Sequence, residues 1–155
     1  MKSNIKTLLL ALAIPLAVGG LSALLSGGAG DYRMLNQPPL SPPGWVFPVV
    51  WTILYLLMGE ASYRIYTSGA DAVAIRSALK AYILQLALNL IWSPVFFGLQ
   101  MYLLAFFILL ALWVAIFVTL RRFSDIDETA GNLLIPYLLW VTFAGYLNFG
   151  VFLLN

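Results

Sequence analysis

Indole and carboxamide side chains recur inside segments that are otherwise built from Leu, Ile, Val, Phe and Ala. The set consists of Trp51, Asn89, Trp92, Trp113, Trp140 and Asn148. Membrane helices usually place Trp at the water interfaces, and a polar tip carried deeper needs a partner inside the protein. Because these tips carry no charge, they suit a pocket for a flat, mostly apolar ligand better than a path for ions.

The spacing of polar and aromatic residues places them on shared helix faces. Residues three and four positions apart lie on one side of a helix. Three such faces are Phe47, Trp51 and Tyr55; Gln85, Asn89, Trp92 and Phe96; and Tyr137, Trp140, Ala144 and Asn148. Each face has two interpretations, helix packing or ligand contact, because a membrane amide such as Asn89 also bonds to neighbouring helices.

The composition assigns these faces to a membrane protein. Hydrophobic residues make up 63% of the chain and charged residues 9%, whereas a soluble domain has roughly 25% charged residues. Cys and His are absent, which excludes disulfides, the usual zinc sites and His or Cys ligation of haem. The few cations lie near the ends of the apolar stretches, so we expect no metal site and no nucleic acid partner.

Five apolar stretches predict an all-α membrane protein, a five-transmembrane-helix bundle that forms a single domain over residues 1–155. A helix needs ~20 residues to cross the ~30 Å hydrocarbon core. The expected helices cover about 6–26, 45–66, 80–99, 102–122 and 130–153. The first stretch shares features with a signal peptide, but the run 8–25 is long enough to span, so we expect a retained helix.

Basic residues predict the orientation of the bundle. Seven lie on the side of the N-terminus and one, Arg33, on the other; the seven are Lys2, Lys6, Arg64, Arg76, Lys80, Arg121 and Arg122. Loops rich in Lys and Arg stay in the cytoplasm. We therefore expect a cytoplasmic N-terminus and an external C-terminus at Asn155.

The long outer connection, 27–44, contains Pro38, Pro39, Pro42 and Pro43. Proline fixes φ, so the connection is either a shaped lid over an outward-facing pocket or a rigid spacer between two helices.

Two other features concern helix packing. Ala11, Pro15, Gly19, Ala23 and Gly27 form a smooth ridge for close helix contact, within the fold or in a dimer. Pro94 frees the carbonyl near Leu90.

Three motifs occur in order along the chain. Residues 42–59 read PPGWVFPVVWTILYLLMG, residues 85–98 read QLALNLIWSPVFFG, and residues 136–148 read PYLLWVTFAGYLN. With these motifs the chain resembles the tryptophan-rich sensory protein family (TspO/MBR), called translocator protein in mitochondria, over about residues 5–155. The resemblance implies a five-helix bundle in a bacterial cell membrane, usually a homodimer, with porphyrin bound in a pocket under the first loop.

The resemblance also implies candidate site residues. By motif position, Trp51 and Trp140 match tryptophans involved in light-driven porphyrin degradation, and Asn89 matches a pocket amide. Residue faces and resemblance together give the expected ligand-binding set: Tyr32, Arg33, Pro42, Trp45, Phe47, Trp51, Tyr55, Gln85, Asn89, Trp92, Phe96, Trp140, Phe143, Ala144 and Asn148.

Two positions depart from the family pattern. Leu40 stands where members often have a further Trp, and no Lys or Arg follows Tyr146. The pattern associated with cholesterol needs such a cation, so sterol recognition by that route is not expected.

Three functions follow as alternatives. The first is a receptor or sensor for protoporphyrin, haem or a related apolar ligand, linked to tetrapyrrole regulation or the stress response, with no cofactor beyond the ligand. The second is a light-dependent porphyrin-degrading enzyme that uses Trp51 and Trp140, and the third is a carrier of porphyrin or lipid. Arg33 either meets a porphyrin carboxylate or pairs with Asp31.

Overall fold

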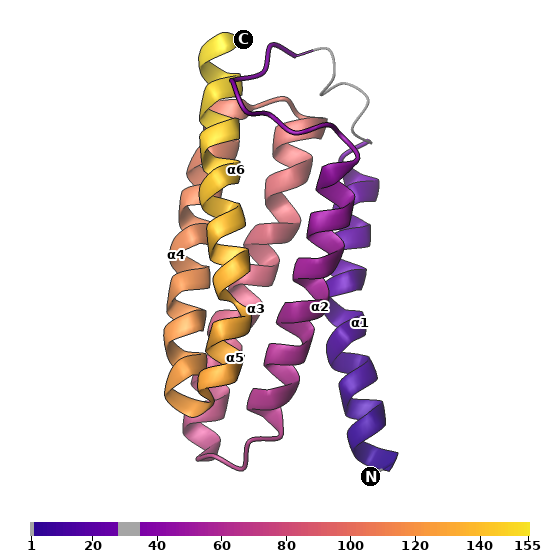
Figure 1. Ribbon diagram of the computed structural model, residues 1–155, viewed down its shortest axis with the longest axis vertical. Helices are drawn as coiled ribbons and strands as arrows, with labels where there is room; N and C mark the ends of the chain where they lie inside the picture. Colours follow the sequence, from indigo (N-terminus) through magenta and orange to yellow (C-terminus); the bar gives the residue numbers. More distant parts are fainter. Residues whose placement is uncertain (1, 28–34) are drawn as a thin grey trace.

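The computed structural model describes residues 2–27 and 35–155 and shows an antiparallel helical bundle (Figure 1). Its elements are α1 (Lys2–Leu25), α2 (Val46–Tyr66), α3 (Ala72–Ser93) with a π-helical turn η2 (Pro94–Gly98), α4 (Tyr102–Ile126), α5 (Glu128–Leu133) and α6 (Ile135–Leu154). In the described chain, five helical units are long and apolar enough to cross a membrane, with α3–η2 and α5–α6 each forming one unit. The predicted all-α membrane bundle is confirmed.

Three helices extend further than the sequence predicted. The first helix begins at Lys2 rather than near residue 6, the third begins at Ala72 rather than near residue 80, and the fourth ends at Ile126 rather than near residue 122. The bilayer thickness predicts only the part of a helix that lies in hydrocarbon. Residues 72–79 contain no Gly or Pro to stop the helix, so it continues beyond that span and leaves a short connection.

The last unit is divided at Leu134, a break that the sequence did not predict. Asp127 caps α5, because its Oδ1 accepts from the backbone N–H groups of Thr129 at 2.9 Å and Ala130 at 3.3 Å. Pro136 stands in the first turn of α6 and has no N–H to continue the hydrogen-bond ladder across the junction.

Helix α1 lies at one edge of the bundle and packs on α2 and α3, while α4 and α6 lie together on the opposite side (Figure 1). The outer face of α1 is exposed, with Leu10 65% and Leu24 81% accessible. The buried core is shared by α2, α3, α4 and α6, and it includes Met58, Leu112, Ile116 and Tyr137. The N-terminus and the α2–α3 connection lie at one end, and the C-terminus lies at the other (Figure 1).

Small residues bring α1 close to α2. A Cβ atom on Gly59 would lie 2.7 Å from the carbonyl oxygen of Ala11 and 2.9 Å from Cα of Leu12. A Cβ on Gly19 would lie 2.6 Å from Cζ of Tyr55. Neither position accepts a side chain without movement, so the ridge predicted on the first helix serves at least this contact within the fold.

Helix α3 changes its winding at Pro94, the residue that the sequence predicted to free a helical carbonyl. The turn η2 follows, with Leu99 N–H donating to the Pro94 carbonyl at 2.9 Å. The carbonyl of Leu90, which Pro94 leaves without its usual helical partner, accepts from Ser22 Oγ of α1 at 3.1 Å. The proline therefore creates an attachment point for α1.

Candidate functional site

A pocket of about 420 Å³ lies between α1, α2 and α3. Helix α1 and the residue after it contribute mainly small side chains, α2 contributes mainly aromatic residues, and α3 with η2 contributes an amide and further rings. The lining consists of Leu16, Gly19, Gly20, Ser22, Ala23 and Ser26; Phe47, Pro48, Trp51, Thr52 and Tyr55; and Asn89, Trp92, Ser93 and Phe97. No member of this lining carries a charge, so the pocket suits an apolar body with a few polar contacts.

Trp51 is the centre of the aromatic wall. Its ring stacks on Tyr55 with the centroids 5.6 Å apart and lies 6.4 Å from the ring of Trp92. Phe47 lies one turn before Trp51 on the same stripe of α2 and also lines the pocket. The spacing of these residues in the sequence therefore translates into one continuous ring surface, which a flat ligand can stack against.

A chain of hydrogen bonds holds the polar floor of the pocket. Tyr55 Oη donates to Asn89 Oδ1 at 3.1 Å, and Asn89 Nδ2 donates to Tyr137 Oη at 2.7 Å. Tyr137 Oη then donates to Gln85 Oε1 at 2.7 Å. Asn89 thus bonds to neighbouring helices and lines the pocket at the same time, so its two interpretations are compatible.

The structure brings five of the predicted site residues into this pocket: Phe47, Trp51, Tyr55, Asn89 and Trp92. Eight others are not part of its lining: Pro42, Trp45, Gln85, Phe96, Trp140, Phe143, Ala144 and Asn148. Trp45 is 68% exposed at the start of α2, as expected of an aromatic residue at a membrane interface. Tyr32 and Arg33, together with Asp31, lie outside the described residues.

The residues of the last helix lie behind the wall rather than in it. Asn148 Oδ1 accepts from Trp92 Nε1 at 3.0 Å, and its Nδ2 donates to the Tyr102 carbonyl at 2.8 Å. Trp140 meets Trp51 edge to face at a centroid distance of 6.5 Å. We expected α6 to share the pocket with α2 and α3, whereas the structure gives that third side to α1.

Trp140 and Phe143 line a separate, shallow groove against α2. The Nε1 atom of Trp140 is buried and has no hydrogen-bond partner among the described residues. A buried donor without a partner is uncommon in proteins. The indole of Trp140 is instead held by contacts with three rings. Its ring centroid lies 6.5 Å from that of Trp51, 5.9 Å from that of Phe47 and 5.6 Å from that of Phe143.

Sequence reasoning missed the α1 wall and the hydroxyl groups that fasten it. Ser26 Oγ donates to the Ser22 carbonyl at 2.6 Å and lies 2.7 Å from Ser93 Oγ. These residues, with Gly20 and Ala23, complete the pocket. The small-residue ridge was the available indication, but small side chains are equally typical of plain helix packing.

Part of the proline-rich connection is docked on α6. Tyr146 Oη donates to the Pro39 carbonyl at 2.6 Å, and Asn155 Nδ2 donates to the Asn36 carbonyl at 2.9 Å. Pro38 is buried in the same area. The described part of the connection, 35–45, contributes no residue to the pocket lining. Here it acts as a spacer tied to the last helix.

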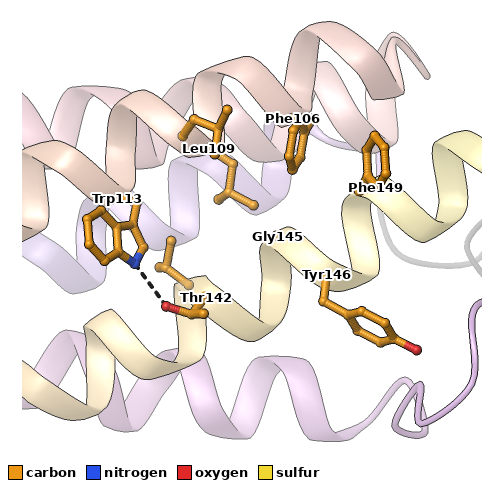
Figure 2. Close-up of a pocket in the computed structure, with 9 residues that line it drawn as sticks. Phe106, Leu109, Trp113, Thr142, Gly145, Tyr146 and Phe149 are labelled. Atoms are coloured by element: carbon orange, nitrogen blue, oxygen red, sulfur yellow. Dashed lines mark hydrogen bonds between the residues drawn. The ribbon is translucent and has the colours of Figure 1, made fainter.

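A third groove, of about 370 Å³, lies between α4 and α6 (Figure 2). One polar contact joins the two helices across the groove, with Trp113 Nε1 donating to Thr142 Oγ1 at 2.9 Å. Thr142 Oγ1 in turn donates to the Leu138 carbonyl at 2.8 Å. Because these polar atoms satisfy each other, the groove offers mainly apolar surface, and the α1–α2–α3 pocket remains the better candidate site.

Comparisons with known proteins agree with the motifs. The model of the TspO/MBR family matches residues 11–154. "Tryptophan-rich protein TspO" of Chlorobaculum tepidum is 38% identical over 157 aligned residues, which cover 100% of the chain and 99% of that protein. "Tryptophan-rich sensory protein" of Cereibacter sphaeroides is 41% identical over 124 residues, which cover 80% of the chain and 76% of that protein. "Translocator protein" of Bos taurus is 36% identical over 139 residues, which cover 88% of the chain and 82% of that protein. The chain therefore belongs to the TspO/MBR family.

Proposed function

We propose that this membrane protein is a sensor that binds a porphyrin in the pocket between α1, α2 and α3. The observation that carries the proposal is the lining itself: an uncharged cavity of about 420 Å³ with Trp51, Tyr55 and Trp92 on its walls and Asn89 at its floor. A porphyrin is a wide apolar disc, so ring faces supply stacking and the amide supplies orientation. The names of the relatives, which include a sensory protein, support the sensor class.

Metal-free protoporphyrin is the ligand that the composition favours. The chain contains no His and no Cys, which are the usual axial ligands of haem iron, although Tyr also serves in some haem proteins. The porphyrin carboxylates need a cation near the mouth of the pocket. Arg33 is the one cation between the first two helices, and we propose that it meets a carboxylate there.

The proposal includes a topology and a quaternary state. The α2–α3 connection lies at the end of the bundle that carries the N-terminus (Figure 1), and Arg64 and Arg76 stand in the helix turns next to this connection. By the positive-inside rule this end faces the cytoplasm of a bacterial cell, and the pocket then lies in the outer half of the membrane. We also propose a homodimer, which light scattering of the protein in detergent measures directly.

A titration tests the binding proposal. Purified protein is mixed with protoporphyrin, haem or cholesterol, and binding is followed by tryptophan quenching and by the porphyrin absorbance. Trp51→Ala removes the central stacking ring, and we expect at least a tenfold loss of protoporphyrin affinity, about 1.4 kcal/mol. Trp113→Phe is the matched control, since Trp113 lies in the α4–α6 groove. Equal affinities for the wild type and Trp51→Ala would reject the site.

A second candidate function, light-driven porphyrin degradation, is favoured by the neighbours of Trp51. Its ring lies 6.2 Å from Tyr137 and 6.5 Å from Trp140, so an oxidised indole at the pocket has further aromatic donors close behind it. Illumination of the protoporphyrin complex decides between the two functions. Steady absorbance in the light, equal in the wild type and Trp51→Phe, rejects the enzyme, and flux in proteoliposomes tests the carrier alternative.

A further inference from the structure

The seam between α1 and α2 is closed in its inner half. Gly59 faces the backbone of Ala11 and Leu12 so closely that a Cβ would come within 2.9 Å of both. At the pocket itself, Gly19 lies directly against the ring of Tyr55, and both residues belong to the lining. No ligand passes between the helices at the level of Gly59, because the two backbones are in contact there.

The same seam is open in its outer half. A Cβ on Gly20 would meet nothing within 4 Å. Five exposed residues line the pocket here and form its rim: Leu16, Gly20 and Ala23 on α1, and Pro48 and Thr52 on α2. Leu16 keeps 37% of its surface accessible even though it lines the pocket. We call this opening the portal.

The side of the pocket between α1 and α3 is closed. Hydrogen bonds join α1 to α3, from Ser22 Oγ to the Leu90 carbonyl at 3.1 Å and between Ser26 and Ser93 Oγ at 2.7 Å. Ser22 is 3% exposed and Ser26 6%. Asn89, at the floor, is 3% exposed. Among the described lining residues, accessible surface is therefore concentrated on the seam between α1 and α2.

The portal lies at the depth of hydrocarbon rather than of water. Gly20 stands five residues before the end of α1 and Thr52 six residues after the start of α2, which is about 8–9 Å along each helix. Half of the hydrocarbon core is about 15 Å thick. The one hydroxyl on the rim, Thr52 Oγ1, donates to the Pro48 carbonyl at 2.7 Å. The rim therefore presents an apolar edge to the membrane.

We propose that the ligand enters and leaves this pocket sideways, from the bilayer, through the portal between the outer halves of α1 and α2. The inference rests on the proposed function, since it concerns the route of the same porphyrin. A wide apolar disc partitions into the membrane before it meets the protein, so a lateral opening lets it reach Trp51 without returning to water. The disc slides between the helices edge first, and its carboxylates stay at the interface.

The test uses the absence of cysteine from the chain. Gly20→Cys places a single thiol on the rim, where the structure has room for a side chain. The variant is reconstituted in vesicles and alkylated with either N-ethylmaleimide or the much larger N-pyrenylmaleimide. Ile83→Cys, at a position of α3 that is 64% exposed and lines none of the three cavities, receives the same labels as the control.

Stopped-flow quenching with protoporphyrin dissolved in the vesicles gives the rates. With the pyrenyl group at residue 20 we expect association and dissociation to slow together, each at least fivefold, while Kd stays within twofold. A gate that blocks a route changes both rates equally, whereas a group that fills the site raises Kd. Both labels at residue 83 should leave the rates and Kd unchanged.

Several outcomes reject the portal. The portal is rejected if protein with the pyrenyl label at residue 20 binds and releases protoporphyrin at the same rates as protein with that label at residue 83. It is also rejected if the label at residue 20 raises Kd and leaves the dissociation rate unchanged. Thr52→Cys, on the opposite rim, repeats the test if Gly20→Cys does not fold, and it must give the same joint slowing. If unlabelled wild-type protein fails to bind protoporphyrin, the proposed function is rejected; normal binding with unaltered rates after labelling rejects the portal alone.

Discussion

The hydroxyl of Tyr137 is the strongest single test of the polar floor beneath the pocket. It is 1% exposed, accepts from Asn89 Nδ2 at 2.7 Å and donates to Gln85 Oε1 at 2.7 Å. Tyr137→Phe removes this oxygen and keeps the ring, so it creates almost no cavity. The change therefore isolates two hydrogen bonds that join α3 to α6.

The magnitude follows from those two bonds. A hydrogen bond between membrane helices contributes about 1 kcal/mol. The loss of two gives about 2 kcal/mol in the free energy of unfolding, or about a 30-fold change in the equilibrium constant. The carbonyl of Gln85 and one N–H of Asn89 also lose their partner in a region that water does not reach, which keeps the cost from falling below this value.

Reversible unfolding in mixed micelles of mild detergent and SDS measures this loss. Tyr66→Phe is the matched control, because Tyr66 is 62% exposed at the end of α2, and it should change stability by less than about 0.5 kcal/mol. A cycle with Asn89→Leu should give a coupling of about 1 kcal/mol between the two residues. If Tyr137→Phe is as stable as Tyr66→Phe, the floor is not a stabilising network and the reasoning is refuted.

Three further predictions concern α1, α6 and the outer connection. Gly59→Ala should destabilise the protein by about 1–3 kcal/mol, because its Cβ meets the α1 backbone at 2.7 Å, whereas Gly20→Ala should be neutral in the same unfolding assay. Asn148→Leu should cost about 2 kcal/mol in unfolding, since it strips the partner from Trp92 Nε1 and from a backbone carbonyl. Arg33→Ala should weaken protoporphyrin binding in the titration, and unchanged affinity would remove Arg33 from the ligand site.

Much of the fold was predictable because a membrane imposes length and periodicity. A stretch of about 20 apolar residues is a spanning helix almost by necessity, since the bilayer offers no hydrogen bonds to other backbones. The four-residue spacing of Phe47, Trp51 and Tyr55 likewise put these rings on one face, and the structure places all of them in one pocket. The extension of α3 to Ala72 was missed because it lies outside the constraint of bilayer length.

The third wall of the pocket was not predictable in the same way. In a soluble protein, hydrophobicity separates the buried face of a helix from the exposed one, but in a membrane both faces are apolar. The exposed Leu10 and the pocket-lining Leu16 therefore look alike in the sequence. Gly20 and Ala23 have no polar atom to suggest a role, and their position becomes clear only when α1 is placed beside α2.

The predicted site residues of α6 show how one motif divides into different physical roles. Asn148 does not reach the pocket, but its Oδ1 holds the indole of Trp92, whose ring does. Trp140 supports Trp51 from behind at 6.5 Å. If the pocket binds the proposed porphyrin, we expect a substitution at either position to change the affinity only by letting a wall ring move. Such a variant should lose affinity for every flat ligand alike, whereas a change at Asn89, which lines the cavity, should alter the preference among ligands with different hydrogen-bonding groups.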